Sequence, residues 1–92
     1  MRGIRETFMT TLNLGNLATF RLVVQRGSFS AAADALGISQ PAVSLQVRQL
    51  EQFLQTRLLE RTGRGIKATA AGMALLAHSE QIDRAVNSAM QS

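Results

Sequence analysis

The sequence predicts a mainly α-helical fold: a core of three short helices, then a two-stranded β-hairpin, then a long C-terminal helix. Two observations lead to this prediction. In four segments the apolar residues recur at spacings of three and four, and each segment follows a residue of the N-cap type, Asn, Ser or Thr. Between the third and fourth segments, two short runs flank a turn that contains two glycines, which is typical of a hairpin.

Residues 1–12 are mixed in character and only weakly periodic. We expect them to form a flexible N-terminal arm, or to lie upstream of a start at Met9. A disordered terminus is the preferred interpretation, and contact of Arg2 or Arg5 with a polyanion is the alternative. The arm has no apolar segment of the kind found in signal peptides, and no run in the chain approaches the ~18 apolar residues that a membrane span needs.

The first core helix is predicted from its N-cap, Asn13, to about Gln25, and Gly27 is expected to end it. Its apolar stripe consists of Leu14, Leu17, Phe20 and Val24. We expect this stripe to form the third wall of the core. Arg21 and Arg26 lie off the stripe and are expected to be solvated.

Two further helices joined through one glycine are predicted over residues 28–54. Ser28 is a suitable N-cap for the first, and Gly37 can adopt the positive φ that ends it. Ser39 is a suitable N-cap for the second, and Pro41 stands in its first turn, where no intrahelical N–H is needed. The apolar faces consist of Phe29, Ala32, Ala33 and Leu36 in the first helix and Val43, Val47, Leu50 and Leu54 in the second. Two amphipathic helices joined in this way are typical of a helix-turn-helix.

A β-hairpin is predicted from strands at Leu58–Glu60 and Ile66–Ala68, joined by the turn Thr62–Gly65. Beside the preceding helix, such a hairpin would form a wing. The stretch contains four basic residues, Arg57, Arg61, Arg64 and Lys67, against one acid, Glu60. Arg64 stands between two glycines at the tip, which suits contact with a DNA minor groove or with phosphate. A solvated charged face is the alternative.

A last helix is predicted from Ala70 to about Met90, with Thr69 as its cap. Apolar and small residues repeat along it at heptad-like spacing, namely Leu75, Ile82 and Ala89, with Ala71, His78 and Ala85 between them. This face is about three turns longer than the core needs. It packs either on the same domain or on a second copy of the chain.

Composition narrows the possible functions. The chain has 92 residues, which corresponds to one domain, and its net charge of +4 with a pI of about 11.5 favours a polyanionic partner. Absence of Cys excludes disulfides, thiolate zinc sites and cysteine nucleophiles. The sequence also lacks a nucleophile elbow, a phosphate-binding loop and an H-E-x-x-H motif, so we expect no enzyme, no cofactor and no metal.

Three segments in order, GSFSAAADALGISQPAVS, RQLE and RLLERTGRGIKATAAG, resemble the N-terminal winged helix-turn-helix DNA-binding domain of the LysR-type transcriptional regulators. The resemblance covers Asn13 to about Leu76. It implies a DNA-binding domain at 13–69 and a linker and dimerisation helix at 70–92, and the arm expected at 1–12 lies outside it. The arm is a departure, because the family usually begins its first helix almost at the initiator.

The resemblance implies that the helix at about 40–54 enters a DNA major groove and the wing at about 58–68 meets a minor groove. The predicted DNA-binding residues are Ser28, Ser30, Ser39, Gln40, Pro41, Ala42, Ser44, Leu45, Arg48, Arg64 and Lys67. A carboxamide can pair bidentately with adenine, so Gln40 is the best candidate for a base contact. The helix at about 40–54 also carries Gln46, Gln49 and Gln52, which we expect to contact base edges as well as phosphates.

Two positions depart from the family's pattern. The family usually has a basic residue where Ala31 stands and commonly has arginine where Leu45 stands. By helical phase, Leu45 lies about 200° around the helix from Val43 and so points away from the buried face. It either contacts thymine methyl groups or is an exposed leucine without a role.

The resemblance further implies a cytoplasmic bacterial regulator that binds an interrupted palindrome in double-stranded DNA as a homodimer or higher homo-oligomer, with no membrane partner. The expected dimerisation residues are Leu75, Ile82, Val86 and Ala89. A small-molecule effector is expected only for a separate C-terminal domain, which this sequence lacks. Two alternatives are a winged-helix protein-interaction module and a sequence-blind architectural DNA-binding protein.

Overall fold

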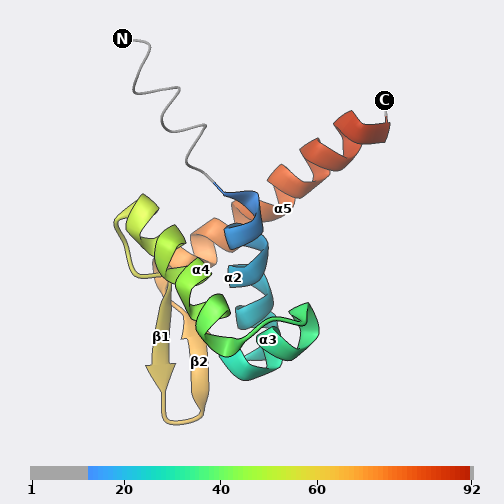
Figure 1. Cartoon of the computed structure of the whole chain (residues 1–92). Helices are drawn as coiled ribbons and strands as arrows, with labels where there is room; N and C mark the ends of the chain where they lie inside the picture. The colour runs from blue at the N-terminus through green and yellow to red at the C-terminus, as the bar shows by residue number, and fades with distance from the viewer. Residues whose placement is uncertain (1–12, 92) are drawn as a thin grey trace.

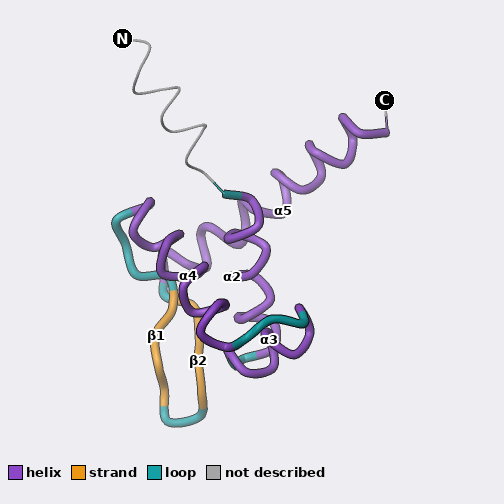
Figure 2. Tube along the Cα trace, in the orientation of Figure 1, coloured by secondary structure: helices purple, strands orange, loops and turns teal. Residues whose placement is uncertain are grey.

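Along the part of the chain that the structure describes, three helices, a hairpin and a long last helix follow one another, as expected (Figures 1 and 2). The computed structural model describes residues 13–91. Its elements are α2 (Leu14–Arg26), α3 (Phe29–Leu36), α4 (Gln40–Leu54), β1 (Leu59–Thr62), β2 (Gly65–Ala68) and α5 (Ala70–Gln91). The predicted arm at residues 1–12 lies outside the described residues.

The caps of the three core helices lie where the sequence predicts them. The side-chain oxygens of Asn13, Ser28 and Ser39 accept backbone N–H groups at 3.1, 3.1 and 3.2 Å, three residues further on. Gly27 and Gly37 end α2 and α3 with φ of 70° and 71°. Local chemistry therefore sets the ends of these helices.

The core lies where α2, α3 and α4 meet the base of the hairpin. Its buried apolar residues are Leu17, Phe20, Val23, Ala32, Ala33, Val43, Val47, Leu50, Leu58 and Leu59. The apolar stripe predicted for α2 is partly wrong: Leu14 is 46% exposed, and the fully buried valine is Val23, while Val24 is only partly buried. Leu36, expected on the buried face of α3, is also exposed.

The hairpin is antiparallel and pairs Leu59 with Ala68 and Thr62 with Gly65. Both strands extend further toward the tip than predicted, so the turn contains only Gly63 and Arg64. The Thr62 hydroxyl oxygen accepts the Arg64 backbone N–H at 3.2 Å. This hydrogen bond braces the two-residue turn.

The first turns of α5 dock on the base of the hairpin. Thr69 caps the helix, because its hydroxyl oxygen accepts the Gly72 N–H at 3.1 Å. Gly72 is buried, and a Cβ at this position would lie 2.3 Å from the Leu58 carbonyl oxygen. Only glycine permits this approach. Beyond Asp83 the helix leaves the domain, and Figure 1 shows its last turns extending away from the core.

Among residues 13–91, no helix combines the length and the apolar character that crossing a membrane requires.

Candidate nucleic-acid interface

The outward face of α4 carries most of the predicted binding residues. Gln40, Pro41, Leu45 and Arg48 are exposed, whereas Ala42 and Ser44 are half-buried. Leu45 is 51% exposed, as its helical phase predicts. The structure therefore presents one continuous surface of polar, basic and apolar side chains along α4, open at its N-terminal end.

The N-cap serines stand at the starts of α3 and α4. The Ser28 and Ser39 hydroxyl oxygens accept backbone N–H groups, so each hydroxyl hydrogen is left to donate. Ser30 is exposed in the first turn of α3. Hydroxyl donors beside a helix N-terminus are suited to an anionic ligand such as a phosphate.

Two glutamines expected on the reading face instead hold α4 against α2. The Thr19 hydroxyl donates to Gln46 Oε1 at 2.5 Å, and Asn16 Nδ2 donates to Gln49 Oε1 at 3.3 Å. Asn16 and Thr19 are themselves buried, so they need these partners. The expectation that Gln46 and Gln49 read bases is therefore wrong for the side-chain oxygens, which face α2.

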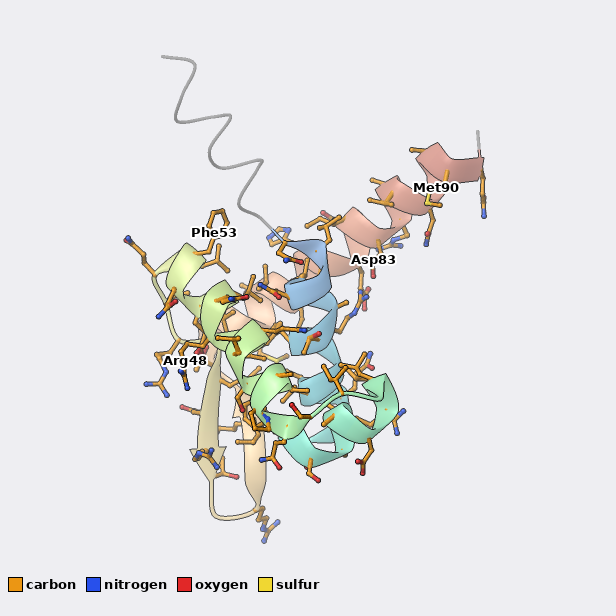
Figure 3. The ribbon with its side chains drawn as sticks, viewed as in Figure 1. Arg48, Phe53, Asp83 and Met90 are labelled. Atoms are coloured by element: carbon orange, nitrogen blue, oxygen red, sulfur yellow. The ribbon has the colours of Figure 1, made fainter. Side chains whose placement is uncertain are left out.

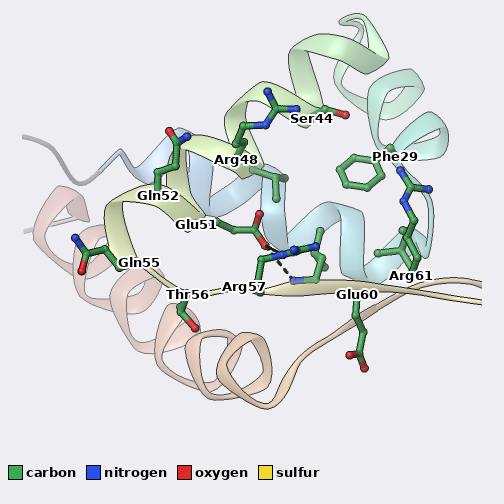
Figure 4. Close-up of a pocket in the computed structure, with 13 residues that line it drawn as sticks. Phe29, Ser44, Arg48, Glu51, Gln52, Gln55, Thr56, Arg57, Glu60 and Arg61 are labelled. Carbon is green, nitrogen blue, oxygen red and sulfur yellow. Dashed lines mark hydrogen bonds and ion pairs between the residues drawn. The ribbon is translucent and has the colours of Figure 1, made fainter.

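A groove of about 760 Å³ separates α4 from the hairpin (Figure 4). Apolar side chains of Phe29, Val47, Leu59 and Ile66 line its inner part. Arg48 belongs to the α4 wall and Arg61 to β1, with Arg57 near the base of the hairpin. Figure 4 shows Arg61 beside Phe29, across the groove from α4. The groove thus has guanidinium groups on both walls.

Glu51 ties the α4 wall to the hairpin. Its Oε2 accepts the backbone N–H of Leu58 at 2.7 Å and that of Leu59 at 3.4 Å, and it lies 3.9 Å from Arg57 Nε. A carboxylate in this groove would repel a polyanion. Here two N–H groups and one guanidinium surround it, so Glu51 fixes the start of the hairpin to α4.

The wing divides its basic residues between two faces. Arg64 is exposed at the tip, as predicted. Lys67 pairs with Glu60 at 3.3 Å across the hairpin, so its charge is partly compensated. Arg61 follows Glu60 along β1, and both residues contribute to the lining of the groove. Arg61 is a further candidate binding residue, and its place among the four basic residues of this stretch is the sequence signal for it.

The predicted dimerisation residues fall into two groups. Leu75 and Ile82 are half-buried and pack against the domain's own core. Val86 is 40% exposed and Ala89 is exposed. The second pair is therefore the more exposed on the surface of a single chain. Met90, 80% exposed, extends that surface to the end of the helix (Figure 3).

Arg21, expected to be solvated, is only partly exposed. Its guanidinium forms an ion pair with Asp83 of α5, a contact between residues 62 positions apart. This ion pair fastens the last packed turn of α5 to α2.

Within the described part of the chain, no three His, Cys, Asp or Glu side chains gather closely enough to hold a metal ion.

Comparison with known proteins agrees with this geometry. The model of the bacterial regulatory helix-turn-helix proteins of the lysR family matches residues 14–73. An uncharacterized HTH-type transcriptional regulator of Azotobacter vinelandii is 45% identical over 71 residues, which are 77% of this chain and 49% of that protein. A probable RuBisCO transcriptional regulator of Nostoc is 46% identical over 69 residues, 75% of this chain and 20% of its own length.

Solved structures give the same result. The DNA-binding domain of BenM in complex with catB site 1 DNA superposes with a TM-score of 0.81 at 35% identity, covering 87% of this chain and 86% of that one. CbnR, a LysR family transcriptional regulator, superposes with a TM-score of 0.82 at 36% identity, and the match covers 87% of this chain and 28% of CbnR. The chain thus spans from about a fifth to half of the length of the curated relatives named above.

Proposed function

This chain belongs to the lysR family of bacterial regulatory helix-turn-helix proteins, and from that membership we propose that it binds a specific double-stranded DNA sequence as the DNA-binding domain of a transcription regulator. The observation that carries this proposal is the surface formed by the outward face of α4 and the arginine-lined groove beside it. The likeness to a BenM domain solved with DNA supports it.

In the proposed complex, α4 lies in a major groove and the wing tip at Arg64 meets the adjacent minor groove. One sugar-phosphate strand separates two adjacent grooves. The groove between α4 and the hairpin would hold that strand, with Arg48 on one wall and Arg61 on the other. Gln40, at the exposed N-terminal end of α4, would pair with a base, and Ser28, Ser30 and Ser39 would donate to phosphates.

We place the DNA-binding unit at residues 13–69 and the linker and dimerisation helix at 70–92, with 1–12 as an arm. Two copies joined through the exposed end of α5 would address two half-sites of an interrupted palindrome about 34 Å apart. The whole protein, longer than this chain in its relatives, would carry an effector-binding domain elsewhere and act in the cytoplasm.

The test of function is a mobility-shift titration on a duplex obtained by in vitro selection and on a scrambled duplex, each at two salt concentrations. We expect tighter binding of the selected duplex and weaker binding of both at high salt. Equal affinity for both duplexes would favour a sequence-blind architectural protein. Absence of salt-dependent binding would favour a protein-interaction module.

Arg64→Ala tests the wing. It should weaken selected and scrambled duplexes similarly and reduce the salt slope by about one unit per recognition unit. Arg84→Ala is the matched control, because Arg84 is an exposed arginine on α5 and its substitution changes the net charge by the same amount. If both variants have the same slope as the parent, the wing does not contact DNA.

Dimerisation is tested best at Val86. Ile82 packs on the core, so a charge there would also damage the fold. Val86→Glu should leave the domain folded and shift sedimentation of a dimer toward the monomer, with weakened binding to a two-half-site duplex. A parent chain that stays monomeric at high concentration and on DNA would contradict the dimer.

A further inference from the structure

Leu45 is the one large apolar side chain of α4 that is exposed. It is 51% exposed, whereas Val43, Val47 and Leu50 on the same helix are buried. At about 100° per residue, its neighbours on the helix surface are Pro41, one turn before, and Arg48, one turn after. Leu45 is neither a core residue nor one of the partly buried apolar residues that pack against the core.

The chemistry of the major groove limits what such a side chain can contact. Base edges there offer hydrogen-bond donors and acceptors at every pair, and the only apolar group is the C5-methyl of thymine. A leucine cannot pair with a donor or acceptor, and burying those groups against it would leave them unsatisfied. An apolar side chain facing a major groove therefore has one favourable partner among the four bases.

We propose that Leu45 selects a thymine in each half-site by packing on its C5-methyl group. The proposal rests on the proposed function, because it requires α4 to lie in the major groove. Pro41 lies one turn before Leu45 and extends the apolar surface, so the methyl would be enclosed on the N-terminal side as well. Arg48 lies one turn after it and would hold the flanking backbone or base.

The experiment replaces each thymine of the selected half-site, one at a time, with deoxyuridine, which removes only the methyl. Binding is measured for the parent chain and for Leu45→Ala. At one position, loss of the methyl should weaken the parent by about fourfold, the value of one buried methyl group. Leu45→Ala should bind the thymine duplex roughly tenfold more weakly and should not distinguish thymine from uracil at that position.

The matched control is Leu14→Ala, which truncates a leucine exposed to a similar extent, 46%, in the first turn of α2. This variant should keep the thymine preference of the parent. Thermal unfolding of Leu45→Ala should match that of the parent, since the side chain is not part of the core. Because uracil substitution leaves the protein unchanged, the result does not depend on how the variant folds.

The outcomes separate the two proposals. If the parent binds its selected duplex specifically but no thymine-to-uracil change is coupled to Leu45, the methyl contact is wrong and the proposed function stands. If no duplex is bound specifically, the proposed function fails first. A large drop in the melting temperature of Leu45→Ala would also overturn the methyl contact, because Leu45 would then be a core residue.

Discussion

The two longest helices, α4 and α5, both carry apolar residues at helical spacing, but they differ in how much of that apolar face is buried in the domain. α4 has 15 residues and buries Val43, Val47 and Leu50 completely or nearly so. α5 has 22 residues, yet only Gly72 and Ser79 are buried, and every residue from 84 to 91 is exposed. An apolar period thus shows that a helix has a face to cover. The period does not show whether that face is covered by the same chain or by another molecule.

The largest expected difference between the helices is in stability. Leu50→Ala should lower the free energy of unfolding by about 3 kcal/mol, because it leaves a cavity in the core. Val86→Ala should change it by less than about 0.5 kcal/mol in the monomer. Urea unfolding of both variants measures the two values. A loss at Val86 that grows with protein concentration would show that a second copy covers this end of α5.

Gly72→Ala tests how α5 is attached. A Cβ here would meet the Leu58 carbonyl oxygen, so the helix start must move, at a cost of about 2 kcal/mol. The matched control is Gly63→Ala in the wing turn, where a Cβ has open space and φ is not positive. We expect the control to be neutral or slightly stabilising in a thermal melt. Equal effects would mean that α5 adjusts its position freely.

The end of α4 offers a smaller change of opposite sign. Gln55 ends the helix with φ of 54°, a left-handed conformation that costs an L side chain about 1 kcal/mol. Gln55→Gly should therefore raise the free energy of unfolding by about 0.5–1 kcal/mol. Gln52→Gly, inside the same helix, should lower it by about 1 kcal/mol. Chemical denaturation of both gives the comparison, and the same sign for both would contradict strain at Gln55.

The smallest effect concerns the ion pair where α5 leaves the domain. Asp83→Asn should cost about 0.5 kcal/mol at low salt and less at high salt, since both partners are partly exposed. Amide exchange in the last turns of α5 should rise more than the global stability falls. Glu80→Gln, which removes the exposed pair with Arg84, is the control and should change neither. An unaltered exchange rate in Asp83→Asn would show that the pair does not hold α5.

Much of the architecture could be predicted because it depends on neighbouring residues. Caps, glycine ends and the hairpin turn arise from contacts over three or four positions, so Asn13, Ser28 and Ser39 reveal helix starts without knowledge of the fold. The exposure of Leu45 follows from the same local period. The positions of Arg64 at the wing tip and of the N-cap serines follow equally from local signals.

Only the tertiary structure determined which polar side chains form hydrogen bonds between helices and which helix faces are buried against another element. Gln46 and Gln49 meet α2 through residues 27 and 33 positions away, and Arg21 meets Asp83 across 62 positions. The separation of two residues along the chain does not fix their distance in space, so no pattern in the sequence pairs them. Likewise, Val23 and Val24 differ by about 100° on α2, and only the placement of α3 and α4 buries the first rather than the second.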